Sequence, residues 1–304
     1  MNKFAFYIQN PKVFKSVLLV QLSPLFTDKQ FIRLQWRNSM SYPLNLDHPR
    51  TFSEKLQWLK LYNRQPEYTV MVDKVKVKEY VASILGEKYI IPTLGVWDDP
   101  EKIDFDTLPD HFVLKCNHNS GTGMYICKDK SKMNVDKVKA ELRKGLKENY
   151  YQKNREWPYK NVPRRILAEQ FIEPKPGTHD LPDYKFFCFN GEPKFCQVIS
   201  GRDTKMCIDF FDRNWHHQPF HEPHFYPFAD EMPKRPENLE IMWNAAAQLA
   251  KREPFSRIDF YDIGTKVYFG EITFFPTSGM GGFNPIEWDY KFGEWITLPQ
   301  KANR

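Results

Sequence analysis

The stretch 256–275, SRIDFYDIGTKVYFGEITFF, predicts a β-hairpin, because two alternating segments flank a glycine-containing turn. A three-residue turn at 264–266 predicts three opposed pairs: Ile263 with Val267, Asp259 with Glu271, and Arg257 with Thr273. Opposed residues share a face, so the four polar side chains of the last two pairs lie together. The other face carries the apolar side chains of Ile258, Phe260, Tyr268, Ile272 and Phe274. A slip of one residue would break both sets, which supports this register.

The polar face of this hairpin favours a metal site. Two facing carboxylates, Asp259 and Glu271, repel each other unless a positive charge lies between them. A hard cation such as magnesium takes oxygen ligands and is often bound together with substrate phosphates. Arg257 beside them could bind a phosphoryl oxygen. The alternative is a surface salt-bridge ladder in which Arg257 pairs with both carboxylates.

Composition limits the classes of function. The chain has 304 residues, of which 41% are hydrophobic, enough for one large domain or two closely joined ones. The net charge of +6 favours anionic partners such as a nucleotide or an acidic glycan. The sequence shows neither zinc-finger spacing nor an aromatic–basic RNA-binding motif, so we expect no nucleic-acid partner. Five cysteines without a CxxC pair favour a reducing compartment, and we expect a cytoplasmic protein.

Residues 1–66 are expected to be mostly helical. Within them, TFSEKLQWLKLYN has a helix-start signal, with Thr51 or Ser53 as the cap and Glu54 in the first turn. The apolar run 17–20 is too short to span a bilayer. We expect this segment to dock on the protein as a helix. The alternative is a peripheral contact with the inner face of the membrane.

The remaining segments predict an α+β fold dominated by antiparallel sheets. They comprise a helix at 69–86 that ends at Gly86, a strand–glycine loop–strand unit at 111–129, and a basic helix at 135–151. Asn190-Gly191 predicts the turn of a second hairpin, and 236–252 predicts another helix.

Three further segments carry candidate ligand-binding residues. Lys115 ends an apolar strand before a loop that contains Gly121 and Gly123, whose backbone N–H groups could approach phosphates. Lys74 is a second candidate cation. Glu169 in ILAEQFIE could contact an adenine. Each feature also has an ordinary interpretation, respectively a turn, a solvated helical lysine and a buried strand.

The order of these pieces resembles the ATP-grasp superfamily, and more closely its TupA-like family from bacterial polysaccharide gene clusters. The resemblance covers about residues 45 to 298 and rests on the following segments: TFSEKLQWLKLY, DKVKVKEYV, IPTLGVWD, FVLKCNHNSG, NREWPYKN, AEQFIE, DYKFFCFNGEPKF and YFGEITFFPTSG. It implies two α+β subdomains that clasp ATP, after a helical region at 1–66. Within an ATP-grasp domain at 67–304, the implied parts are 67–110, a phosphate-loop subdomain at 111–172 and a metal-binding subdomain at 173–304.

The resemblance also implies roles for individual residues. Lys74, Lys115 and the Ser120–Gly123 loop would contact the phosphates, whereas Glu169, Phe171 and Ile172 would contact adenine. Asp183 would contact the ribose and Lys185 a phosphate. Asp259 and Glu271 would hold magnesium, with Arg257 on the transferred phosphoryl group. Thr273 stands where many ATP-grasp enzymes have asparagine, which leaves the second metal position open. Arg202 could guide a phosphate or the acceptor carboxylate, or belong to a solvated loop.

The implied activity is an ATP-dependent carboxylate–amine ligase that joins an amino acid or amine to a uronic acid in surface polysaccharide synthesis. A glycosyltransferase is one alternative, and Asp104-Phe105-Asp106 matches the letters of its DxD metal motif. A kinase acting on a sugar or small acid is another alternative. A non-catalytic nucleotide-binding scaffold is disfavoured by the joint presence of Lys115, Asp259 and Glu271.

Overall fold

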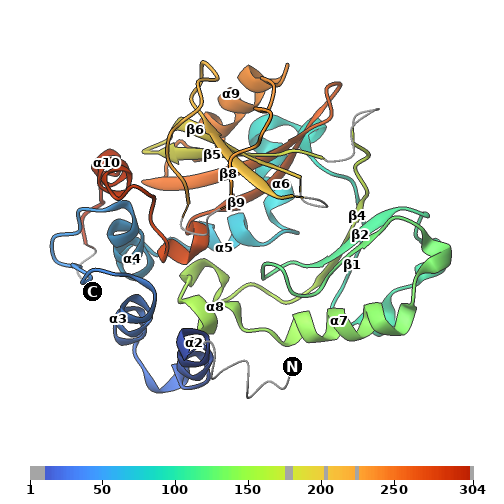
Figure 1. Cartoon of the computed structure of the whole chain (residues 1–304). Coiled ribbons are helices and arrows are strands. Elements are labelled where there is room, and N and C mark those ends of the chain that lie inside the picture. The colour runs from blue at the N-terminus through green and yellow to red at the C-terminus, as the bar shows by residue number, and fades with distance from the viewer. Residues whose placement is uncertain (1–10, 175–180, 202–204, 223–225, 302–304) are drawn as a thin grey trace.

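Two antiparallel sheets form the framework of the chain (Figure 1). The computed structural model describes residues 11–174, 181–201, 205–222 and 226–301. The first sheet has the strand order β1-β4-β2-β3, with strands Thr93–Trp97 (β1), Ile166–Gln170 (β4), Phe112–Cys116 (β2) and Met124–Cys127 (β3). Helix α7 (Val135–Lys147) runs along this sheet, and the short helix α8 (Tyr150–Asn154) follows it.

The second sheet has the order β7-β6-β5-β8-β9 and carries the largest part of the core. Its strands are Cys207–Phe211 (β7), Glu192–Ser200 (β6), Asp183–Phe189 (β5), Phe255–Asp262 (β8) and Val267–Thr273 (β9). The β5–β6 turn is the predicted Asn190-Gly191, and both residues have positive φ, 48° and 86°. Asparagine and glycine tolerate that conformation best, which explains why this pair predicted the hairpin correctly.

The hairpin at 256–275 has the predicted register at its polar end but not at its turn. Arg257 opposes Thr273 and Asp259 opposes Glu271, as expected. Closer to the turn, however, Asp262 opposes Val267, because Ile263 bonds to the Lys266 carbonyl across a tighter connection.

A bulge between Asp259 and Phe260 reconciles the two ends of the hairpin. It leaves Gly270 as the extra residue of β9 and pairs Phe260 with the buried Phe269. Tyr268 therefore moves off the apolar face on which the simple count had placed it, and is half-buried.

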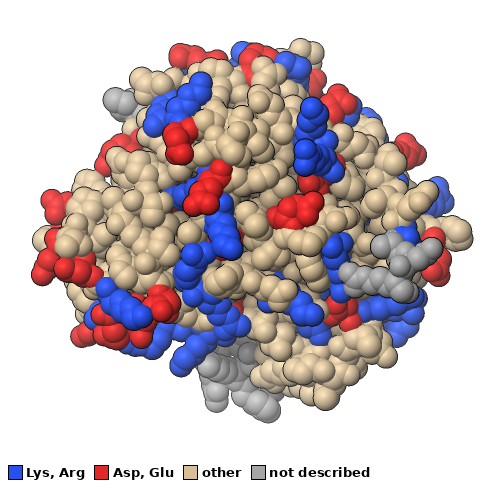
Figure 2. Space-filling model, turned by 180° about the vertical axis from the view of Figure 1, so that it is seen from behind, with Lys and Arg blue, Asp and Glu red and all other residues tan. Residues whose placement is uncertain are grey.

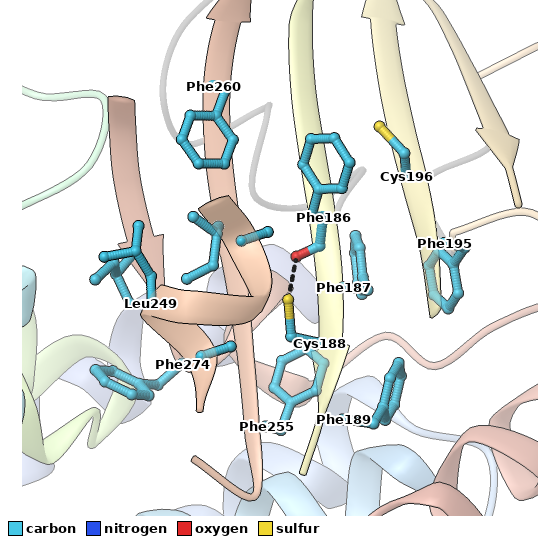
Figure 3. Packing of buried hydrophobic residues seen from close by; sticks show 14 of the residues in the cluster. Phe186, Phe187, Cys188, Phe189, Phe195, Cys196, Leu249, Phe255, Phe260 and Phe274 are labelled. Atoms are coloured by element: carbon cyan, nitrogen blue, oxygen red, sulfur yellow. Dashed lines mark hydrogen bonds between the residues drawn. The ribbon is translucent and has the colours of Figure 1, made fainter. Parts of the chain in front are cut away.

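The middle strand of the second sheet, β5, is buried along its whole length. Figure 3 shows its aromatic side chains packed between those of the neighbouring strands. The Phe187 and Phe195 rings stack with centroids 4.7 Å apart, and Phe186 meets Trp243 of helix α9 (Leu239–Ala250) edge-on. Aromatic side chains bury large areas, so much of the 16% aromatic content serves this core.

The helical N-terminal region shares that core instead of forming one of its own. Helix α4 (Phe52–Tyr62) begins with a capping box in which Thr51, one of the two predicted caps, pairs with Glu54, and it places Phe52 against Phe189 and Phe255. Helix α10 (Glu287–Trp295) packs beside α4. Helix α3 (Asp28–Ser39) precedes them, and helix α2 (Pro11–Gln21) lies against α3 but buries none of its residues, so the expected docking of this segment is shallow. No helix in the described ranges is long and apolar enough to cross a membrane.

The single helix predicted at 69–86 is wrong, because two helices stand there. Helix α5 (Glu67–Val72) ends at Asp73, and helix α6 (Val77–Leu85) starts after a turn. The buried Asp73 carboxylate causes the break. It accepts the Val75 amide at 3.0 Å, the Asn117 side chain at 2.7 Å and the Arg165 guanidinium at 2.9 Å. Local side-chain bonds of this kind compete with a continuous helix.

Charges of both signs are interspersed on the face of the molecule shown in Figure 2. The net charge of +6 is therefore not gathered into a single basic surface on that face. The five cysteines are all buried and free.

Helix α7 approaches the loop after β2 so closely that only glycine fits there. A Cβ atom on Gly145 would lie 2.6 Å from the Gly123 Cα atom and 2.7 Å from the Cys116 sulfur. We expect Gly145→Ala to lower the free energy of unfolding by roughly 1–2 kcal/mol, because overpacking outweighs alanine's better helix propensity. Thermal or denaturant unfolding would measure it. The exposed neighbour Lys144→Ala is the control, and equal stability of both variants would contradict the close contact.

Candidate functional site

Three neighbouring strands of the second sheet bring polar side chains to one face. Lys185 of β5 opposes Asp259 of β8, and Asp259 opposes Glu271 of β9. Arg257 and Thr273 extend the same face by one pair. The sequence could predict the last two strands because a local turn joins them. The pairing of β5 with β8 spans 74 residues and needed the structure.

Arg257 and Lys185 bind the carboxylates of this face. The Arg257 guanidinium donates to both oxygens of Asp259 at 2.8 Å, to Glu271 at 3.2 Å and to the Thr273 hydroxyl oxygen at 3.1 Å. Lys185 bridges Asp259 and Asp183, with 2.7 Å to the latter. Asp259 is 2% exposed, so removing either cation would leave a buried charge poorly compensated. The ladder considered as the alternative is thus present, but it is buried and includes a second cation.

Glu271 is the more accessible of the two carboxylates, with 36% of its side chain exposed. Lys74 reaches it at 4.0 Å and donates to the Asn119 carbonyl at 2.7 Å. Desolvation works to raise the pKa of Glu271, but Lys74 and Arg257 outweigh it and bring that pKa down to about 2. Glu271 is therefore ionised at neutral pH and can act as an oxygen ligand.

A second set of charges lies on the four-stranded sheet. Lys115 of β2 pairs with Glu169 of β4 at 2.5 Å, and Lys78 of α6 pairs with the same carboxylate at 2.7 Å. Burial acts to raise the pKa of Glu169, but the two lysines lower it overall. The sequence alone does not indicate Lys78 as a site residue, because its partner lies 91 residues further along the chain.

A pocket lies between the two sheets, beside the second set of charges. It is lined from one sheet by Lys115 and Glu169, from the other by Phe269 and Gly270, and between them by Lys74, Val77, Lys78, Ile90 and Ile91. It thus combines apolar walls with charged groups at the junction of the two sheets, the usual character of a ligand pocket. Sequence reasoning missed its apolar walls, because nothing local distinguishes them from core residues.

The glycine loop after Lys115 is positioned by its first residues. The Asn117 side chain donates to Asp73, which also anchors the turn that carries Lys74. At the tip, Ser120 and Gly121 are exposed, and Gly121 has φ 87°. Gly123 is buried, and its amide donates to the Glu141 side chain at 3.3 Å. The exposed part of the predicted loop is therefore its first half.

The remaining predicted residues divide into three groups. Phe171 and Ile172 directly follow β4 and are half-buried, with Phe171 edge-on to His111. Asp183 begins β5 and belongs to the second sheet's ion-pair cluster through Lys185. Arg202 lies outside the described residues.

The DxD letters at 104–106 form a local cap, in which Asp104 accepts the Asp106 amide at 3.1 Å and Phe105 is buried. Asp104 thus caps a short 3₁₀ helix, Phe105–Thr107, which contains Asp106.

A buried polar cluster behind the hairpin was not foreseen. Lys60 of α4 is fully buried and donates to the Ser278 carbonyl at 2.7 Å and its hydroxyl at 2.8 Å. Gln57 donates to the Gly279 carbonyl at 2.8 Å. Ser278 has φ 55°, a strained conformation for a non-glycine residue, and these bonds stabilise it. The buried Glu156 completes the cluster, and burial raises its pKa.

The donor set fits a complex of magnesium with a nucleotide. Asp259, Glu271 and Thr273 offer hard oxygen ligands on adjacent strands. Within the described ranges no group of three or more His, Cys, Asp or Glu side chains is arranged for a metal, so two carboxylates would need substrate oxygens to complete the coordination. Five cations (Lys74, Lys78, Lys115, Lys185 and Arg257) face four carboxylates (Glu169, Asp183, Asp259 and Glu271), which leaves a net charge of +1 for an anion.

A family model described as TupA-like ATP-grasp matches residues 54–297 of the chain. The chain belongs to the TupA-like ATP-grasp family. The match spans both sheets and every described site residue, which confirms the fold expected from the motif order. No curated protein matches the chain.

Solved structures with a similar arrangement include D-alanine–D-alanine ligases. The enzyme from Bacillus anthracis, complexed with ATP, is 16% identical over 67% of this chain and 53% of its own, with a TM-score of 0.39. The enzyme from Helicobacter pylori is 14% identical over 81% and 69%, with a TM-score of 0.44. The ATP-grasp ligase PsnB, complexed with a minimal precursor, Mg and ADP, is 11% identical over 73% and 57%, with a TM-score of 0.37. The chain spans only about half the length of the first of these, and the family assignment rests on the family match.

The metal assignment predicts the behaviour of Glu271→Gln. This change keeps the size of the side chain but removes the charge, so the magnesium concentration needed for ATP to raise the melting temperature should increase by at least about tenfold. Thermal shift over a magnesium titration at fixed ATP would measure this. The control is Glu192→Gln on β6, whose carboxylate is 69% exposed and pairs with Lys194. A magnesium dependence unchanged in Glu271→Gln would make the assignment wrong.

Proposed function

We propose that the protein is an ATP-dependent carboxylate–amine ligase, with the nucleotide between the two sheets. The observation that carries the proposal is the shared face of Arg257, Asp259, Glu271 and Thr273, with Lys185 beside it. Family membership supports ATP as the phosphoryl donor. Asp259 and Glu271 would hold magnesium, with Thr273 as a weaker ligand. The bound magnesium would neutralise charge on the transferred phosphoryl group.

The side chains of the chain would act mainly by positioning and by charge. Lys74, Lys115 and the Ser120–Gly123 loop would hold phosphates. Arg257 and Lys185 would face the transferred phosphoryl group, where preorganised cations stabilise the charge of the transition state. Glu169, Phe171 and Ile172 would line the adenine end and Asp183 the ribose, with Arg202 guiding the acceptor.

The reaction would proceed in two transfers. A carboxylate oxygen of the acid attacks the terminal phosphorus of ATP, which releases ADP and forms an acyl phosphate. The amine nitrogen then attacks the acyl carbon, phosphate leaves, and the nitrogen loses a proton to give the amide. Both steps depend on holding the reactants close together, and neither requires a covalent enzyme intermediate.

For the substrates, we propose a uronic acid of a surface polysaccharide and an amino acid or amine, joined in the cytoplasm. The positive charge of the chain and its 16% aromatic content suit an acidic, sugar-bearing acceptor. The DxD letters of the glycosyltransferase alternative lie in a short 3₁₀ helix, where the Asp104 side chain accepts the Asp106 amide, and not at the end of a strand.

The proposal predicts that ADP release over many turnovers requires an acid and an amine together, because the acid alone supports only the first transfer. The purified protein would be incubated with magnesium-ATP, uronic acids or uronic-acid glycans, and amino acids, singly and combined. Mass spectrometry should detect the acid increased by the mass of the amine less one water. ADP release with one hydroxyl substrate would instead indicate a kinase. Sugar transfer from a nucleotide sugar without ATP would overturn the proposal.

A further inference from the structure

Helix α2 presents two different faces. The face toward α3 carries Ser16, Leu19 and Val20, which are half-buried, and Asn38 of α3 donates to the Ser16 hydroxyl at 2.7 Å and to the Lys12 carbonyl at 3.2 Å. These contacts fix how the helix is rotated. Helix α2 itself lies at the lower edge of the molecule in Figure 1.

The outward face of α2 is apolar and continues into the turn that follows it. Its exposed residues recur at the spacing of one helix face and then extend to the turn: Val13 (42% exposed), Phe14 (46%), Val17 (36%), Leu18 (42%), Leu22 (41%) and Leu25 (75%). Six of the fifteen large hydrophobic residues exposed in the described structure therefore lie within thirteen residues of sequence. Such a concentration marks an interaction surface.

The exposed charged residues of α2 and α3 are all positive. Lys12 and Lys15 on α2, and Lys29, Arg33 and Arg37 on α3, are all exposed, and none forms an ion pair within the described ranges. Asp28 is the single acidic residue of segment 11–40, and Arg64 at 2.6 Å and Arg155 at 3.1 Å already neutralise it.

These features together match a surface that binds anionic lipid. A helix of eleven residues is about 16 Å long, too short to span a bilayer but sufficient to lie in its interface. Interfacial helices combine an apolar face with flanking lysine and arginine, which contact anionic headgroups. Self-association is disfavoured, because two copies of this surface in contact would bring their positive charges together.

We propose that α2, its following turn and the basic side of α3 form a docking surface for an anionic membrane. We call it the α2–α3 surface. The apolar strip would enter the headgroup region, and the five basic side chains would lie against lipid phosphates. This inference does not depend on the proposed ligase reaction, because the surface and its test involve neither ATP nor the acceptor.

The test is co-sedimentation of the full chain with vesicles. We expect binding to vesicles that contain phosphatidylglycerol, weak binding to pure phosphatidylcholine, and a decrease as salt screens the charges. Val17→Asp/Leu18→Asp should abolish binding. Lys12→Glu/Lys15→Glu should lower the partition coefficient by at least about tenfold, because each basic residue near an anionic surface contributes about one kcal/mol.

Matched variants separate this proposal from others. Ile241→Asp changes an exposed apolar residue of α9, and Lys144→Glu/Lys147→Glu reverses two exposed lysines of α7. Both should bind as the original chain does. Absence of binding by the original chain, or equal loss in the α7 variant, would overturn the proposal. A different outcome would also overturn it: the original chain is a dimer that does not bind vesicles, and Val17→Asp/Leu18→Asp makes it monomeric. The surface would then serve self-association.

Discussion

Two carboxylates, Asp259 and Glu271, lie opposite each other on adjacent strands, and the surrounding structure provides the cations that make this arrangement stable. Arg257 contacts both of them, Lys185 reaches one from the strand on the other side, and Lys74 approaches the other from the turn after α5. Buried anions without such partners would be protonated or would destabilise the fold. Several long-range features of the fold, among them the pairing of β5 with β8 and the break between α5 and α6, can be understood as supplying these cations.

The break at Asp73 shows how the two sheets are tied to the same charges. Asp73 receives Asn117 from the end of β2 and Arg165 from the start of β4, so the turn that carries Lys74 is attached to the four-stranded sheet. Lys74 itself extends toward Glu271 on the five-stranded sheet. The buried Asp73 carboxylate therefore attaches the turn of Lys74 to one sheet, while Lys74 reaches the other sheet and also lines the pocket between them.

An interaction could be predicted from the sequence when its partners are close together along the chain, and not when they are far apart. The Asn190-Gly191 turn and the polar pairs of the last hairpin depend on neighbours in sequence, and both were predicted. The start of α4 was predicted too, although its cap was left open between Thr51 and Ser53. The bulge at Gly270 was missed because its effect is hidden at the polar end. The turn is shorter than predicted, which shifts the pairing, and the extra residue of the bulge shifts it back before Asp259 and Glu271. The pairs Lys78–Glu169 and Lys60–Ser278 join residues far apart along the chain, and no periodic pattern could indicate them.

The mutual pairing of these groups also bears on how a metal and a nucleotide would bind together. A divalent cation that takes Asp259 and Glu271 as ligands competes with Arg257 and Lys185 for the same oxygens. Each cation released from a carboxylate then needs another anion, and phosphate oxygens accept such donors with favourable geometry. Binding of the nucleotide first would have the same effect. Phosphates that draw Arg257 away from the carboxylates would free those oxygens to bind the metal. We therefore infer that metal and nucleotide favour each other's binding, and by linkage the effect must be equal in both directions.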